Sequence, residues 1–398
     1  MSLTVFSQLI SPLSEFLKTH GAKIDESCDS RSLFFKDFLL SIIYGLTIRA
    51  ESLRKLSLDL KSNPNLSSLP LRYIPFETLR DGFKRFNILF FNDLYIYLLN
   101  EIDWLQVPEL SQLGVLKAID GSLFPMISSM DWACYKKNKK ALRLHLSFCL
   151  NTLCPSEFVI QAANSSERTF LKSILEKGVT YIADRGYFAF DLVAEMTGKG
   201  AFFVLRMKDN VKFTLQTTLV ITGKIPACFA HIKDEIIRFD NDKNHLSYRI
   251  VRFRVWDSHF ILTTNRLDLT TLQVILLYAY RWQIELIFKV LKRTLNGIHL
   301  MVQNEKGVKA YFYLLMICGL LQIKLRQDFL KNNSKVEQNN TPKKKPKIIT
   351  KANPDVWVNQ INQIFTKGFK ISTNWLLFLK NLIGQVIDNQ IIILFNSV

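Results

Sequence analysis

The stretch Tyr278–Lys292, YAYRWQIELIFKVLK, constrains the fold more than any other part of the sequence. It predicts one long helix, because apolar side chains recur at helical spacing and no Pro or Gly interrupts them. Thr270 can cap the start of this helix, and Gln273 three residues later completes a capping box. Asn296-Gly297 is a pair suited to the left-handed backbone conformation that ends helices.

One side of the predicted helix carries a stripe of polar side chains. Its members, at about 100° per residue, are Tyr278, Arg281, Glu285 and Lys292. The opposite half of the helix is apolar and must be buried. A plain i,i+4 ion pair between Arg281 and Glu285 on an ordinary amphipathic helix is the alternative interpretation.

The composition indicates a globular protein that binds a polyanion. The chain has 398 residues, 48% of them hydrophobic, and a formal net charge of +18. This length is enough for two or three domains. A basic excess of this size points to nucleic acid, with an anionic membrane surface as the alternative. The longest apolar run, Tyr311–Leu321, is too short to span a bilayer, which argues against a membrane protein.

The cysteines and the N-terminus give an expectation about the compartment. Six cysteines are scattered along the chain, and no His lies at zinc-finger spacing from the closest pair. The first residues lack the basic and apolar regions of a signal peptide. We therefore expect reduced thiols and a cytoplasmic location in a bacterial cell, with association with the nucleoid when DNA is bound.

Residues 111–325 alternate between strand and helix patterns. The predicted order is three strands, a helix, a strand, a helix and a strand, over residues 115–120, 141–150, 158–163, 166–176, 180–183, 190–197 and 201–207. This is the order of an RNase H-like (ribonuclease H/retroviral integrase-like) α/β core, with a mixed sheet and helices on both faces. Residues 209–266 are apolar or alternating segments, which predict an all-β insertion.

Helical segments flank this core on both sides. Residues 1–110 read as helical and basic, which suits DNA binding and equally a plain helical lid. Residues 326–354, rich in Asn, Lys and Pro, predict a flexible basic linker. Residues 355–398 predict a small helical tail that is apolar enough to pack on something, such as a second copy of the chain.

Two predicted strands end in an aspartate. They are Asp120 in AIDGS and Asp184 in IADRGY. Side chains at strand ends leave the sheet and meet at one edge, and the first and fourth strands of this order are neighbours. We therefore expect both aspartates beside each other, with Glu285 crossing the same edge. The alternatives are an ordinary Asp-Gly turn at Asp120 and a local ion pair between Asp184 and Arg185.

Three converging carboxylates repel one another unless a cation lies between them. Oxygen ligands of this kind favour Mg²⁺ or Mn²⁺ over zinc. Two such ions about 4 Å apart can activate a water or a 3′-hydroxyl and stabilise the leaving oxygen of a phosphodiester. Arg281 and Lys292, on the same helix, would then hold phosphates near the metals.

These residues resemble the DDE transposases of the insertion-sequence-four family of bacterial insertion sequences. The spacing Tyr278-x2-Arg281-x3-Glu285-x6-Lys292 fits that family's Tyr-Arg-Glu-Lys signature without a gap. AIDGS, IADRGY and the intervening LRLHLSF are similar to its other motifs, and the predicted β insertion is similar too. The resemblance covers residues 110–325.

The resemblance implies a cut-and-paste DNA transposase. It implies metal ligation by Asp120, Asp184 and Glu285, and contact with the DNA backbone by Tyr278, Arg281 and Lys292. The implied partners are double-stranded DNA with terminal inverted repeats and target DNA, with the protein as a homodimer in the DNA complex. Trp256 or Phe260 would stack on a flipped base, with packing between strands as the alternative for each.

Two other functions remain open on the sequence alone. A metal-dependent nuclease on the same core needs the carboxylates, but it has no use for the Tyr, Arg and Lys partners or for the β insertion. A DNA-binding protein derived from a transposase, and no longer catalytic, has no need of the intact acidic triad.

Overall fold

The computed structural model describes residues 3–340, except for residues 29–31, 128, 138, 222–228, 244, 256–257, 296 and 298. The predicted tail, residues 355–398, and the second half of the predicted linker lie outside the described residues.

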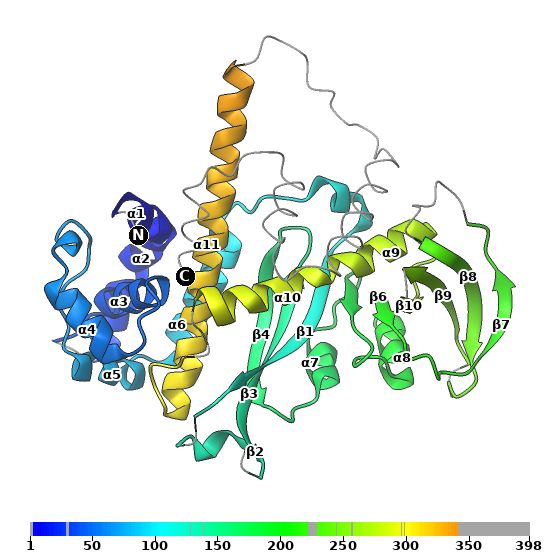
Figure 1. Ribbon diagram of the computed structural model, residues 1–398, viewed down its shortest axis with the longest axis horizontal. Coiled ribbons are helices and arrows are strands. Elements are labelled where there is room, and N and C mark those ends of the chain that lie inside the picture. The colour runs from blue at the N-terminus through cyan, green and yellow to red at the C-terminus, as the bar shows by residue number, and fades with distance from the viewer. Residues whose placement is uncertain are drawn as a thin grey trace.

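Within the described residues, ten strands form one mixed sheet (Figure 1). They are β1 (Leu116–Pro125), β2 (Cys134–Lys136), β3 (Lys139–Cys149), β4 (Cys154–Ala162), β5 (Thr180–Ala183), β6 (Phe202–Arg206), β7 (Phe213–Thr218), β8 (Phe229–Phe239), β9 (Ser247–Val255) and β10 (Ser258–Thr264). Their order is β2-β3-β1-β5-β6-β10-β9-β8-β7, and β4 pairs with β3. Strand β5 runs parallel to both β1 and β6, whereas the other pairs are antiparallel.

The strand order confirms the central expectation from the sequence. The first and fourth predicted strands, β1 and β5, are neighbours in the middle of the sheet. The strands β7 to β10 arise from the segment 209–266, whose described residues contain no helix. Because β10 pairs with β6, this segment extends the main sheet and does not form a separate sheet beside it.

Helices cover both faces of the sheet. They are α7 (Glu167–Ser173) and α8 (Phe190–Gly198) on one face, and α9 (Thr271–Tyr280) and α10 (Trp282–Lys289) on the other. Successive side chains of a strand point to opposite faces of the sheet, so neighbouring residues of one strand pack against different helices. Ile119 of β1 is buried in the cluster that contains Val193 of α8. Its neighbour Ala118 is buried in the cluster that contains Ile275 of α9.

A helical unit precedes the sheet in the chain. It contains α1 (Leu3–Ile10), α2 (Ser14–Ser27), α3 (Phe35–Thr47), α4 (Leu53–Ser62), α5 (Phe76–Arg85) and α6 (Ile88–Glu101). These helices share one hydrophobic core with α9, α10 and the last helix, α11 (Glu305–Asn340). The hydroxyl of Tyr313 on α11 donates a 3.1 Å hydrogen bond to Asn92 on α6, which ties α11 to the N-terminal helical unit.

Helix α11 corrects one expectation from the sequence and bears on a second. It continues through residue 326, where the linker is predicted to begin, as far as Asn340. The reason is that residues 305–341 contain no proline, so nothing forbids the helix before Pro342. The span Glu305–Phe329 is also long and apolar enough to cross a membrane, unlike the shorter apolar run considered above. However, 67% of its most apolar window is buried inside the protein, as in a core helix.

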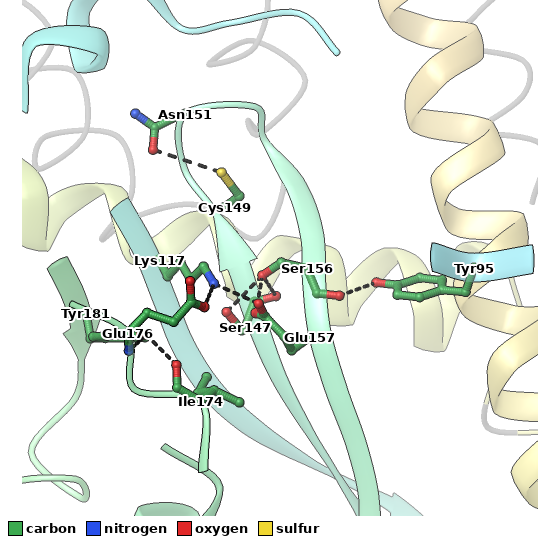
Figure 2. A network of polar contacts seen from close by, with 10 residues as sticks. All are labelled: Tyr95, Lys117, Ser147, Cys149, Asn151, Ser156, Glu157, Ile174, Glu176 and Tyr181. Carbon is green, nitrogen blue, oxygen red and sulfur yellow. Dashed lines mark hydrogen bonds and ion pairs between the residues drawn. The ribbon is translucent and has the colours of Figure 1, made fainter. Parts of the chain in front are cut away.

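A polar network ties β1 to its neighbours away from the aspartates (Figure 2). The buried amine of Lys117 lies 2.7 Å from Glu157 Oε1 and 2.8 Å from Glu176 Oε1. Burial opposes ionisation of Glu157, but hydrogen bonds from Lys117 and Ser156 outweigh it and lower the pKa of this carboxyl. A buried charge of this kind is tolerated because it is paired. The network is therefore structural, and Glu157 is separate from the predicted acidic triad.

Candidate active site

The two aspartates lie next to each other at one rim of the sheet. The parallel pairing of β1 with β5 ends at Ile119 and Ala183, so Asp120 and Asp184 each directly follow the last paired residue of neighbouring strands. Strand β1 itself does not end at Asp120, as predicted, but continues to Pro125 along β3. Asp120 is therefore the first residue of β1 beyond its parallel pairing with β5.

Backbone amides fix both carboxylates. The N–H of Gly121 donates a 2.8 Å hydrogen bond to Asp120 Oδ1. The N–H of Arg185 donates a 2.7 Å hydrogen bond to Asp184 Oδ1. Each aspartate thus bonds to the amide that follows it, which restricts the direction of its carboxylate.

The predicted long helix is divided into α9, α10 and a π-helical turn. Its start is as expected, because Thr270 and Gln273 form a capping box. The prediction of one uninterrupted α-helix is wrong: α9 ends before Arg281, α10 begins after it, and Val290–Thr294 is π-helical. A π turn has one more residue than a regular turn, and such turns are frequent at functional sites. The side chains after it are rotated relative to an ideal helix.

The end of the helix has a different cause from the one predicted. Gly297 does not have a left-handed backbone, and Asn296 lies outside the described residues. The N–H of Gly297 donates a 2.9 Å hydrogen bond to the carbonyl oxygen of Leu291. A Cβ on Gly297 would lie 2.5 Å from that oxygen. A glycine is therefore needed because the backbone approaches itself closely.

All four residues of the stripe face the rim that carries the aspartates. The hydroxyl of Tyr278 donates a 3.2 Å hydrogen bond to Asp184 Oδ1. The Nζ of Lys292 donates a 2.8 Å hydrogen bond to Ser122 Oγ, two residues after Asp120.

Arg281 connects two of the three carboxylates. Its Nη2 donates a 2.6 Å hydrogen bond to Glu285 Oε1, and its Nη1 lies 3.9 Å from Asp120 Oδ2. The i,i+4 ion pair considered as an alternative is thus present, and it forms part of the acidic rim. The Nε of Arg281 is buried with no hydrogen-bond partner in the described part of the protein. A buried donor without a partner lowers the stability of the fold unless another acceptor binds to it.

Burial dominates the electrostatics of this rim. It raises the pKa of Asp120 to about 6; Arg281 and the amide of Gly121 oppose this rise, whereas Glu285 and Glu167 add to it. Burial alone would lower the pKa of Arg281, but Tyr278, Glu285 and Asp120 outweigh it and raise that pKa. Burial also lowers the pKa of Lys292, against the attraction of Asp120. A carboxyl with a raised pKa and a buried cation beside it are typical of functional sites.

The carboxylates supply only oxygen donors, which suits Mg²⁺ or Mn²⁺. Among the described residues, no three His, Cys, Asp or Glu side chains are arranged around one point at which they could hold a metal ion. Arg281 gives a reason why these carboxylates do not surround a common point: its guanidinium contacts both Asp120 and Glu285. The donor set fits a hard dication, provided that Arg281 gives up one of these contacts.

The two aromatic candidates for base stacking have different outcomes. Trp256 lies outside the described residues. Phe260 is only 4% exposed. It stacks on Phe253 with ring centroids 5.1 Å apart, and the guanidinium of Arg206 lies 4.7 Å from its centroid. Phe260 therefore presents no accessible ring face to a base, and the expectation of strand packing applies to it.

The structure adds an acidic residue that sequence reasoning missed. Glu167, the first residue of α7, forms an ion pair with Arg143 of β3 and lies close to Gly121 and Gly186. An acidic residue at the start of a helix is an ordinary helix signal. Nothing in the sequence therefore distinguishes Glu167 from a residue that only favours the helix.

Comparisons with known proteins agree with this geometry. A model of the family described as "Transposase DDE domain" matches residues 112–321. The protein y4zB of Sinorhizobium fredii (strain NBRC 101917 / NGR234), named as a transposase, is 27% identical over 219 residues, which are 54% of this chain and 62% of that protein. A protein of Geobacillus stearothermophilus, named as the transposase of insertion sequence element IS5377, is 21% identical over 196 residues, which are 48% of this chain and 51% of that protein.

The match thus spans less than two thirds of the length of both relatives. A solved structure of a piggyBac transposase synaptic complex with hairpin DNA gives a TM-score of 0.45 at 8% identity, covering 96% of this chain and 84% of that chain. A likeness of this size does not establish a shared fold.

Proposed function

Because the chain belongs to the Transposase DDE domain family, we propose that it is a DNA transposase. It cleaves phosphodiester bonds at the ends of a mobile element and joins those ends to target DNA. One observation carries the proposal: Asp120, Asp184 and Glu285 come from distant parts of the chain and meet at one sheet rim through Tyr278 and Arg281. The Tyr-Arg-Glu-Lys spacing supports a finer assignment to the insertion-sequence-four family.

In this proposal the three carboxylates are the metal ligands and the catalytic residues. When bound, a pair of Mg²⁺ or Mn²⁺ ions supplies activation of the attacking water or 3′-hydroxyl and stabilisation of the leaving oxygen. The raised pKa of Asp120 is in keeping with this role, because a carboxyl that is costly to ionise gains most from a cation. Glu285 must release the hydrogen bond from Arg281 to serve the same purpose.

The stripe residues position the DNA and the ligands. Tyr278 holds the direction of the Asp184 carboxylate through its hydroxyl. A guanidinium released from Glu285 presents a planar set of donors to a phosphate. Lys292 donates a hydrogen bond to Ser122, which is two residues after Asp120 on β1. From this position its amine can neutralise a second phosphate. In this proposal Arg281 and Lys292 contact the backbone of the transposon end through these donors, and the family resemblance assigns Tyr278 a contact with the same backbone.

The fold suits the same proposal. The order β4-β3-β1-β5-β6 with helices on both faces supports an RNase H-like core, and the sheet extension β7 to β10 supports the expected β insertion ahead of the Glu285 helix. The N-terminal helices are the DNA-binding segment. The enzyme is cytoplasmic, acts on double-stranded DNA with terminal inverted repeats, and works as a homodimer in the DNA complex. The tail at 355–398 is the segment proposed to join the two copies.

Two other functions compete with this one. A metal-dependent nuclease on the same core would use the same carboxylates, but it would not need Lys292 and Tyr278 directed at them. A non-catalytic DNA-binding protein would have no reason to keep a carboxylate with a raised pKa at Asp120. Transposition differs from both because it joins the cleaved 3′ end to a second DNA.

The test is cleavage and joining of labelled DNA. The DNA that flanks the gene supplies the candidate end repeats, and the full chain is incubated with this DNA, a target plasmid and Mg²⁺. We expect cleavage at the repeat and covalent joining, with both lost in Asp184→Ala. Cleavage without joining would favour the nuclease, binding without cleavage would favour the non-catalytic protein, and an active Asp184→Ala variant would contradict the metal assignment.

A further inference from the structure

Two glycines beside the aspartates face the two oxygens of one carboxylate. A Cβ on Gly121 would lie 3.3 Å from Glu167 Oε1, and a Cβ on Gly186 would lie 3.3 Å from Glu167 Oε2. Neither glycine has a left-handed backbone. At Gly121 a Cβ would also lie 3.3 Å from His145 Nδ1 and 3.4 Å from Arg143 Cδ. Glycine is therefore favoured by close side chains, with Glu167 among them at both positions, and not by the backbone conformation. Gly121 follows Asp120 directly, and Gly186 is two residues after Asp184.

The carboxylate of Glu167 is held in this position from the other side. Arg143 of β3 forms an ion pair with Glu167 through Nη1. The Nε of Arg143 donates a 3.1 Å hydrogen bond to the carbonyl oxygen of Ala163, just before α7. Both side chains are largely covered, with 21% exposed for Arg143 and 25% for Glu167. An ion pair with this further hydrogen bond and partial burial keeps one geometry better than an exposed pair does.

From this arrangement we propose that Glu167 is a positioning residue of the candidate active site. Its carboxylate, held by Arg143, is a spacer between the chain segments that follow Asp120 and Asp184, and it sets the separation of the two aspartates that would hold a divalent cation. This inference rests on the proposed function, because it concerns the same metal site.

The charge of Glu167 also acts at the site. It contributes, with burial and Glu285, to the raised pKa of Asp120. A negative charge that acts on the Asp120 carboxylate makes the rim more favourable for a cation. Removing a hydrogen-bonding partner that orients a metal ligand commonly weakens metal binding about tenfold or more. We expect a loss of metal affinity of the same size when Glu167, which sets the separation of the ligands, is removed.

Binding of Mn²⁺ to the full-length protein, measured by electron paramagnetic resonance, tests the inference. Glu167→Ala and Gly186→Ala should each weaken Mn²⁺ binding about tenfold. Apart from its two chain neighbours, Glu167 is the only described residue within 4 Å of a Cβ at position 186. The double variant should therefore bind Mn²⁺ no more weakly than Glu167→Ala alone. Gly198→Ala is the matched control, because a Cβ there meets nothing within 4 Å, and it should bind Mn²⁺ like the unsubstituted protein.

The other outcomes separate this inference from the proposed function. If Asp184→Ala abolishes Mn²⁺ binding but the two single substitutions have no effect or add independently, Glu167 is not a spacer and only this inference fails. A lowered Tm with unchanged Mn²⁺ affinity would show a packing contact alone and would also overturn it. If the unsubstituted protein binds no Mn²⁺, or if Asp184→Ala binds it equally well, both the proposed function and this inference fail.

Discussion

The Nη2 of Arg281 donates a 2.6 Å hydrogen bond to Glu285 Oε1 across the start of α10. The same guanidinium lies 3.9 Å from Asp120, and its side chain is only 10% exposed. One buried positive charge thus serves two of the three carboxylates at the rim. A divalent cation that binds these carboxylates competes with Arg281, so the two should substitute for each other.

Replacing Arg281 tests this competition. Arg281→Met leaves Asp120 and Glu285 without their shared counter-charge, and we expect a loss of about 1–3 kcal/mol in the free energy of unfolding. Added Mg²⁺ should raise the Tm of Arg281→Met more than that of the unsubstituted protein, because the ion takes over the role of the guanidinium. Arg293→Met, at an exposed position on the same segment, should leave the Mg²⁺ response unchanged. An equal response in all three proteins would contradict the competition.

The neighbouring aspartates could be predicted from the sequence because their cause is topological. Once β1 and β5 are parallel neighbours, Asp120 and Asp184 must lie together where their pairing ends, although β1 itself continues to Pro125. The capping box at Thr270 is also a local signal, since it depends on two residues three positions apart. The catalytic roles of these residues stay predictions.

The features that could not be predicted depend on contacts between distant segments. The helix wheel assumes an ideal helix, and neither the interruption at Arg281 nor the π turn at Val290–Thr294 follows from the residues themselves. Glu167 becomes part of the rim only because α7 packs beside β1. Phe260 is buried by Phe253 and Arg206, which come from two other strands.

The raised pKa of Asp120 predicts a pH-dependent cost. The ordinary pKa is 3.8, and burial is the main reason why the folded value is about 6. Well below its ordinary pKa of 3.8 the carboxyl is protonated in both the folded and unfolded states, so it costs nothing. Above pH 6 it is ionised in both states, and the folded protein loses about 3 kcal/mol relative to a neutral group, because one pKa unit corresponds to about 1.4 kcal/mol. Asp120 therefore destabilises the protein as pH rises from 4 to 6.

The measurement is the free energy of unfolding in denaturant between pH 4.5 and 8. Asp120→Asn should be more stable than the unsubstituted protein at pH 7.5, and the difference should shrink toward pH 4.5. Asp131→Asn, at a side chain that is 92% exposed, should change stability by no more than about 0.5 kcal/mol. A constant difference for Asp120→Asn across this range would show that the carboxyl is not held in an unfavourable environment.

Lys292 is predicted to bind a DNA phosphate. Lys292→Ala should weaken binding to the end DNA and reduce the slope of log affinity against log salt by about 0.9, since one phosphate contact is lost. Mn²⁺ binding should be retained, because Lys292 contributes no ligand. Lys309, which pairs with Glu305 on α11, provides the control Lys309→Ala. An unchanged salt slope for Lys292→Ala would remove Lys292 from the DNA contact.

Tyr278 is predicted to orient Asp184 through its hydroxyl. Tyr278→Phe keeps the buried ring, which is 6% exposed, but removes the 3.2 Å hydrogen bond to Asp184. We expect a loss of about 1 kcal/mol in stability, and a Mg²⁺ concentration for half-maximal cleavage that rises about tenfold. Tyr313→Phe removes a comparable 3.1 Å hydrogen bond to Asn92 between α11 and α6. It should lower stability by a similar amount while the Mg²⁺ requirement stays the same. If both variants shift the Mg²⁺ requirement equally, the effect arises from general loosening of the protein and not from the direction of the Asp184 carboxylate.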